Sequence, residues 1–70
     1  MDEKKIIDVL AGRRRQLNIS QRALGERIGM SRNHIGRIER HELSPTLGVV
    51  TRMIEALDMD MELKEKPDRD

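Results

Sequence analysis

Residues 20–40 constrain the fold most strongly, because they contain two short helical patterns with almost no chain between them. Ser20 and Ser31 each precede such a pattern, and a serine hydroxyl starts a helix by accepting a hydrogen bond from a free amide of the first turn. Gly29 follows the first pattern, where glycine typically ends a helix. We therefore predict helices over 21–28 and from 32 to about 40, joined by three residues.

The helix predicted from residue 32 has one apolar and one basic side. At 100° per residue, Ile35 and Ile38 fall together and should face the core. The opposite side carries three arginines, an amide and a glycine, at Arg32, Asn33, Gly36, Arg37 and Arg40. Arginine suits guanine O6 and N7, and asparagine suits adenine N6 and N7. Taken alone, however, these residues fit a solvated basic face better.

Charge is strongly segregated along the chain, although the net charge is only +1. Residues 1–12 carry a net −1, residues 13–40 carry +6 from eight arginines and two glutamates, and residues 41–70 carry −4. A concentrated positive segment is the electrostatic signature of a phosphate-binding face. We expect the acidic C-terminal third to face away from DNA.

Several classes of function are disfavoured by what the chain lacks. It has no cysteine, and His34 and His41 have no carboxylate at metal-ligand spacing, so no metal or cofactor is expected. No nucleophile–base pairing indicates an enzyme. Without Phe, Tyr or Trp, stacking on single-stranded bases is not available. With no long apolar run and no signal peptide, we expect no membrane association but a cytoplasmic protein that is nucleoid-associated when bound to DNA.

The first helix is predicted from residue 2 or 3 to residue 16. Its core-facing residues follow helical spacing: Ile6, Ile7, Leu10 and Leu17. Arg14 lies four residues after Leu10 and should approach the core, where a partly buried arginine needs a carboxylate partner. In the next helix, Gly25 costs roughly 1 kcal/mol relative to alanine, which makes sense if the following helix crosses close by.

The segment QRALGERIGMSRNHIGRIER, Gln21 to Arg40, resembles the helix-turn-helix of the lambda-repressor/Cro-like family. The resemblance extends from about residue 6 to residue 57. It implies that the helix from residue 32 reads the major groove and that a fifth helix follows the fourth. One departure is His41, where the family usually has a glycine in the left-handed conformation, which histidine tolerates better than most residues.

This resemblance also implies roles for individual residues. Contacts to base edges are implied for Arg32, Asn33 and Arg37. Contacts to DNA phosphate are implied for Gln21, Arg22, Ser31 and Arg40. The carboxylate partner of Arg14 is implied to be Glu39, in a structural salt bridge.

A fourth helix is predicted to start at Ser44 and Pro45, because a capping residue followed by proline is typical of a helix N-terminus. Its apolar stripe consists of Leu47, Val50, Met53, Ile54 and Leu57. Val49 is not required by that stripe.

The segment after this helix has a period of two, which predicts a β-strand. From residue 58 to residue 64, Met59, Met61 and Leu63 alternate with charged residues. A single strand in a helical monomer has no partner for its backbone groups, so we predict antiparallel pairing of two copies across a twofold axis. The alternative is a frayed tail with coincidental methionines.

A strand in place of the fifth helix resembles the antitoxins of the high-persistence type. The resemblance implies a C-terminal strand that pairs between subunits, autorepression, and a kinase-fold toxin as protein partner. The predicted organisation is a helix-turn-helix DNA-binding domain over 1–57, a dimerisation strand over 58–64 and a disordered charged tail over 65–70.

We therefore expect an all-α, four-helix lambda-repressor-like domain that dimerises through a C-terminal β-strand and represses transcription from a palindromic operator in double-stranded DNA. Seventy residues leave no room for a ligand-sensing domain, so a protein partner is one expected means of regulation. One alternative is a stand-alone regulator, of phage type or a restriction–modification controller. Another is a protein-interaction module with this fold that does not bind DNA.

Overall fold

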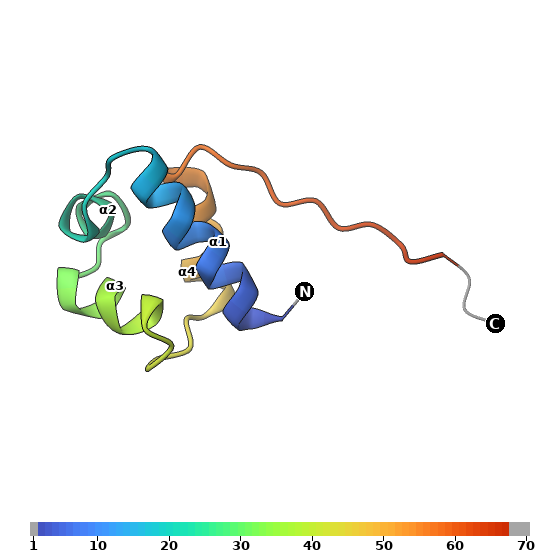
Figure 1. Ribbon diagram of the computed structural model, residues 1–70, viewed down its shortest axis with the longest axis horizontal. Coiled ribbons are helices and arrows are strands. Elements are labelled where there is room, and N and C mark those ends of the chain that lie inside the picture. The colour runs from blue at the N-terminus through green and yellow to red at the C-terminus, as the bar shows by residue number, and fades with distance from the viewer. Residues whose placement is uncertain (1, 68–70) are drawn as a thin grey trace.

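The part of the chain that the structure describes folds into four α-helices followed by an extended segment (Figure 1). The computed structural model describes residues 2–67, and no β-strand occurs among them. The helices are α1 (Glu3–Gln16), α2 (Gln21–Ile28), α3 (Arg32–Glu39) and α4 (Leu47–Ala56). The predicted helix positions are therefore confirmed for α1, α2 and α3, which begin and end within a residue of the expected bounds.

One apolar core lies between the four helices. The side chains that are almost completely buried come from every helix or its end, and they are Ile7, Leu24, Ile35, Ile38, Met53 and Leu57. Two predicted core residues are instead exposed: Leu17, which follows the last residue of α1, and Leu47, which is 71% exposed in the first turn of α4. Val49, which the predicted stripe omitted, is buried.

The start of α4 lies later than predicted. Thr46, not Ser44, caps the helix, and its Oγ1 accepts a hydrogen bond from the Val49 amide at 3.2 Å. The Ser44 hydroxyl donates instead to Glu3 Oε2 at 2.7 Å, across the chain to α1. Pro45 therefore lies outside the helix, and α4 begins at Leu47.

Three helices end at a non-glycine residue in the left-handed conformation. Asn18, His41 and Asp58 have φ values of 58°, 63° and 59°. After α3, the His41 amide donates to the Ile38 carbonyl at 3.0 Å and the Glu42 amide donates to the Arg37 carbonyl at 2.9 Å. This pair of bonds is the Schellman motif, and Asn, Asp and His are the residues that tolerate its left-handed position best after glycine. The left-handed conformation expected of His41 is confirmed.

The segment after α4 differs from the predicted strand. Asp58 has a positive φ, and Met59 packs against the core while its amide donates to the Ile54 carbonyl at 3.0 Å, so both residues belong to the helix end. Residues 60–67 then run away from α2 and α3 without regular structure (Figure 1). Met61 is 44% exposed and Leu63 is 90% exposed. A strand needs a neighbouring backbone, and the described chain supplies none here. Of the predicted disordered tail, residues 68–70 lie outside the described residues.

Gly25 is required by the turn between α2 and α3. A Cβ atom on Gly25 would lie against the Met30 backbone carbonyl oxygen, closer than any real contact, and the Met30 amide donates to the Gly25 carbonyl at 2.8 Å. The close approach expected here is made by the turn that leads into α3 and by the backbone of its N-cap, Ser31.

Alanine at Gly25 should destabilise the protein by about 1–3 kcal/mol, because the clash with the Met30 backbone outweighs the better helix propensity. The matched control is Gly12→Ala in α1, where a Cβ atom meets nothing within 4 Å. That variant should be stabilised by up to about 1 kcal/mol. Urea unfolding followed by circular dichroism measures both, and equal effects of the two substitutions would contradict this account of Gly25.

Candidate nucleic-acid interface

The side of α3 opposite the core is open to solvent. Ser31 caps the helix by accepting a hydrogen bond from the His34 amide at 3.1 Å, which fixes the first turn. Arg32, Asn33 and Arg37 are all exposed, on the side away from the buried Ile35 and Ile38. A partner whose surface follows the axis of α3 could therefore reach all three side chains.

A buried ion pair holds the other side of α3. Arg14 Nε donates to Glu39 Oε2 at 2.7 Å, and Arg14 Nη2 donates to Glu39 Oε1 at 2.9 Å. The two side chains are 11% and 5% exposed. Arg14 Nη1 also donates to the Ile19 carbonyl at 2.9 Å, in the turn before α2. The pair therefore ties α1, the start of α2 and the end of α3 together.

Gln21 completes this arrangement from α2. Its Nε2 donates to Glu39 Oε1 at 2.9 Å, and its side-chain oxygen would lie 3.4 Å from a Cβ atom on Gly36. An amide nitrogen carries two hydrogens, so one donor of Gln21 remains for another acceptor. The residue predicted to contact phosphate is thus also part of the frame that positions α3.

The Glu39 carboxylate is stabilised in its charged form. Burial raises the pKa of Glu39, but the hydrogen bonds from Arg14 and Gln21, together with the charge of Arg14, outweigh burial and hold the pKa below the ordinary value. A glutamate whose pKa is lowered by folding stabilises the folded state above its unfolded pKa, and this contribution is lost as the pH falls through the folded pKa.

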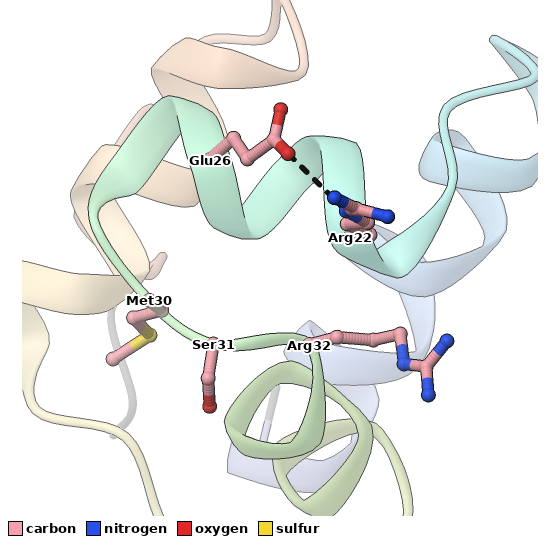
Figure 2. Close-up of a pocket in the computed structure, with 5 residues that line it drawn as sticks. All are labelled: Arg22, Glu26, Met30, Ser31 and Arg32. Carbon is pink, nitrogen blue, oxygen red and sulfur yellow. Dashed lines mark ion pairs between the residues drawn. The ribbon is translucent and has the colours of Figure 1, made fainter.

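A shallow hollow separates α2 from the start of α3 (Figure 2). It is lined by Arg22, Glu26, Met30, Ser31 and Arg32 and has a volume of about 430 Å³. Arg22 Nε lies 3.3 Å from Glu26 Oε1, and both side chains are more than two-thirds exposed. Figure 2 shows the guanidinium groups of Arg22 and Arg32 on the same side of the hollow. The structure therefore brings together three of the predicted contact residues: Arg22, Ser31 and Arg32.

One acidic residue at this surface was missed by the sequence analysis. Glu42 Oε2 accepts a hydrogen bond from Arg40 Nε at 2.9 Å, and Glu42 Oε1 lies 4.0 Å from Arg37 Nε. The hydrogen bond from Arg40 and its charge lower the pKa of Glu42, and the same bond raises the pKa of Arg40. The left-handed position of His41 could have indicated this contact, because a Schellman turn folds the next residue back along the helix.

Several arginines of the basic segment serve the fold instead of this surface. Arg13 Nε donates to the Leu57 carbonyl at 3.1 Å, and Arg27 Nη1 donates to the Ala56 carbonyl at 3.1 Å, so both bind the end of α4. Arg14 is buried in its pair with Glu39. The total of eight arginines in residues 13–40 therefore overstates the charge available on the open side of α3.

The histidines and the acidic groups do not build a metal centre. Within residues 2–67, no three metal-ligating side chains come together. His34 is exposed on α3, and the His41 ring lies 2.9 Å from Asp8 Oδ1 on α1. In the same part of the chain, every helix is too short or too polar to cross a membrane.

Short capped helices, a three-residue turn and an exposed polar side on α3 define a helix-turn-helix domain. The family model described as helix-turn-helix matches residues 10–64. The chain belongs to this family, and within it to the lambda-repressor/Cro-like type.

A solved structure carries the same fold. It is the crystal structure of the P22 c2 repressor protein in complex with synthetic operator 9T in the presence of Tl⁺. The two chains are 31% identical, with a TM-score of 0.71, and the match covers 79% of this chain and 83% of the other. The lambda-repressor-like arrangement of the four helices is thereby confirmed.

A curated relative is considerably longer. The chain is 36% identical over 61 residues to an uncharacterized HTH-type transcriptional regulator, y4dL, of Sinorhizobium fredii (strain NBRC 101917 / NGR234). The match covers 87% of this chain but spans only 31% of the length of that relative.

Replacing Glu39 by alanine should destabilise the protein by about 3 kcal/mol or more, because Arg14 would stay buried without its counter-ion. The loss should be largest near neutral pH and should shrink as the pH falls through 4.5 and below, because the lowered pKa makes the contribution of Glu39 disappear on acidification. Unfolding measured against urea at a series of pH values tests both statements.

The control is Glu26→Ala, which removes a carboxylate from an exposed pair. It should change the stability by less than about 0.5 kcal/mol. If Glu39→Ala cost no more than Glu26→Ala, the pair with Arg14 would not hold α3 in place.

Proposed function

We propose that this protein is a sequence-specific repressor that binds double-stranded DNA with α3 in the major groove. The observation that carries the proposal is the row Arg32, Asn33 and Arg37, exposed on a helix whose opposite side is fixed by a buried ion pair. The similarity to a repressor described in complex with its operator supports it. Direct readout of bases needs a helix that is held rigidly and whose polar side chains can reach the base edges.

In this proposal, Arg32, Asn33 and Arg37 contact base edges, each good bidentate contact contributing about 1–3 kcal/mol of discrimination. Gln21, Arg22, Ser31 and Arg40 contact phosphates on either side of the groove. Arg22 and Ser31 flank the hollow next to Arg32, and Gln21 retains a donor beyond its bond to Glu39. These phosphate contacts set the register of α3 and make binding dependent on salt.

We propose further that two copies pair through residues 60–66 and bind a palindromic operator, whose symmetry would mirror the twofold axis of the dimer. The charge pattern supports antiparallel pairing centred on Leu63. In that register Asp60 of one copy lies opposite Lys66 of the other, and Glu62 lies opposite Lys64. Opposite charges facing each other across antiparallel strands are stabilising.

The subtype that we propose is an autorepressing antitoxin with a kinase-fold toxin as partner. Its support is the extended segment in residues 60–67, where a fifth helix is expected of the family. Copurification of a larger protein, or a neighbouring kinase-like gene, would support this assignment. A stand-alone regulator would copurify with no such partner. A protein-interaction module that does not bind DNA would enrich no duplex in the selection experiment described next.

Selection from a library of random DNA duplexes should enrich a palindromic consensus for the full-length protein at moderate salt. Arg32→Ala and Arg37→Ala should each weaken binding to that consensus by about 5- to 150-fold, which corresponds to 1–3 kcal/mol per lost base contact, with specificity relaxed at one position of each half-site. Fluorescence anisotropy on the consensus and on single-base variants measures this loss.

The control is Lys5→Ala, which removes the same charge from an exposed position in the first turn of α1. It should leave the base preference unchanged. If no duplex were enriched by the wild-type protein, or if Arg32→Ala and Lys5→Ala behaved alike on every base variant, the readout assigned to α3 would be wrong.

The dimer should dissociate when the apolar side of the segment becomes charged. The double variant Met61→Asp, Leu63→Asp should sediment as a monomer and should bind the palindrome more weakly, because each half-site must then be bound separately. Both residues lie beyond Met59, so the core contact of the helix end stays intact. The control is Leu47→Asp, which puts the same charge at an exposed apolar position at the start of α4, outside the segment, and should leave the protein dimeric. A double variant that remained dimeric would place the interface elsewhere.

A further inference from the structure

The turn after α3 puts a negative charge beside two arginines of the proposed DNA-binding face. His41 is left-handed, and the Glu42 amide donates to the Arg37 carbonyl. Glu42 is therefore folded back against the last turn of α3. Its side chain lies next to Arg37 and Arg40.

Arg40 is held by Glu42 at two points. Arg40 Nε donates to Glu42 Oε2 at 2.9 Å, and Arg40 Nη2 donates to Glu42 Oε1 at 3.4 Å. The other terminal nitrogen, Arg40 Nη1, would lie 3.1 Å from a Cβ atom on Gly36. The guanidinium group thus lies along α3, between Glu42 and Gly36, and Glu42 accepts hydrogen bonds from two of its five N–H donors.

This contact is accessible to solvent, so DNA can compete for it. The side chains of Arg40 and Glu42 are 60% and 50% exposed, and that of Arg37 is 55% exposed. A phosphate that binds Arg40 must either displace the Glu42 carboxylate or stay close to its negative charge. Either event makes binding to phosphate less favourable.

We propose that Glu42 is a specificity-determining residue. It competes with DNA phosphate for Arg40, and also for Arg37 where the DNA offers no matching base, and so limits binding to DNA of arbitrary sequence. The inference rests on the proposed DNA binding and deepens it. Sequence-independent affinity comes almost entirely from phosphate contacts. Reducing the positive charge available to phosphates therefore leaves base contacts to decide where the protein binds.

The other exposed ion pair at this surface is built differently. Arg22 and Glu26 lie four residues apart on α2, they make a single contact of 3.3 Å, and their side chains are 78% and 68% exposed. A pair of this kind holds its arginine weakly. Glu42, in contrast, contacts two arginines and hydrogen-bonds one of them twice.

The test measures the affinity of the full-length protein for a labelled duplex of arbitrary sequence at several salt concentrations. Glu42→Gln should bind about three- to tenfold more tightly at low salt, and its affinity should fall more steeply with salt, by about one unit of slope for each arginine that becomes free to bind phosphate. The Schellman turn uses backbone groups, so the variant keeps the fold, and an unchanged Tm verifies this.

Two comparisons isolate the local effect from the change in net charge. Glu55→Gln makes the same change on α4, where Glu55 is exposed next to Arg52 and Ala56, and should alter the affinity by less than about twofold because distant charges are screened. In a background that also carries Arg37→Ala and Arg40→Ala, Glu42→Gln should lose most of its effect, because both arginines for which Glu42 competes are absent.

The outcomes separate this inference from the proposed function. The inference about Glu42 would be overturned, with the proposed DNA binding unaffected, by either of two results. One is that Glu42→Gln binds arbitrary DNA no more tightly than Glu55→Gln, and the other is that it binds more weakly than the wild type. If the same increase in affinity persisted without Arg37 and Arg40, the effect would not act through them and the inference would also fail. If neither the wild type nor Glu42→Gln bound any duplex at low salt, the proposed function itself would fail.

Discussion

The ion pair between Arg14 and Glu39 is the interaction on which the rest of the structure depends. Removing two charges from water is costly unless the charged groups form hydrogen bonds within the protein. Arg14 donates two hydrogen bonds to Glu39 and one to the Ile19 carbonyl, and Glu39 also accepts one from Gln21. No buried side-chain nitrogen or oxygen in the described residues lacks a partner. Because these bonds are directional, they fix how α3 lies against α1 and α2, which apolar packing alone would define less sharply.

The direction of α3 in turn decides which charges are available to a partner. The sequence concentrates arginine in residues 13–40, but the fold divides these side chains among three uses. Arg14 lies in the core, and Arg13 and Arg27 bind carbonyl groups at the end of α4. Arg15 is exposed on α1, and the remainder lie along α2 and α3. Electrostatic attraction to DNA depends on that remainder and on the carboxylates beside it. This is why Glu42, a single residue, can have a disproportionate effect at this surface.

Local rules explain which parts of the fold and the site could be predicted from the sequence. The caps Ser20 and Ser31, the inward-facing Ile35 and Ile38 and the left-handed His41 all follow from residues within one turn of each other. The errors arose where distant residues decide. Thr46 caps α4 in place of Ser44, whose hydroxyl donates to Glu3, 41 residues away in sequence. The contact of Glu42 with Arg40 is a different case, because it is local but forms beyond the end of the helix, where helical periodicity no longer applies.

The C-terminal segment illustrates the same limit at the level of assembly. Its alternating pattern suggested three apolar residues on one side of a strand, but the end of α4 captures Met59 through a Schellman turn, which leaves Met61 and Leu63. These two line a groove of about 560 Å³ together with Ile6 and Val9 of α1. Two exposed apolar side chains cannot hold a strand pair alone, since an isolated pair of strands is marginal in water. A dimer built from this segment would therefore need further apolar contacts, and Ile6 and Val9 of α1 are the neighbouring side chains that can supply them.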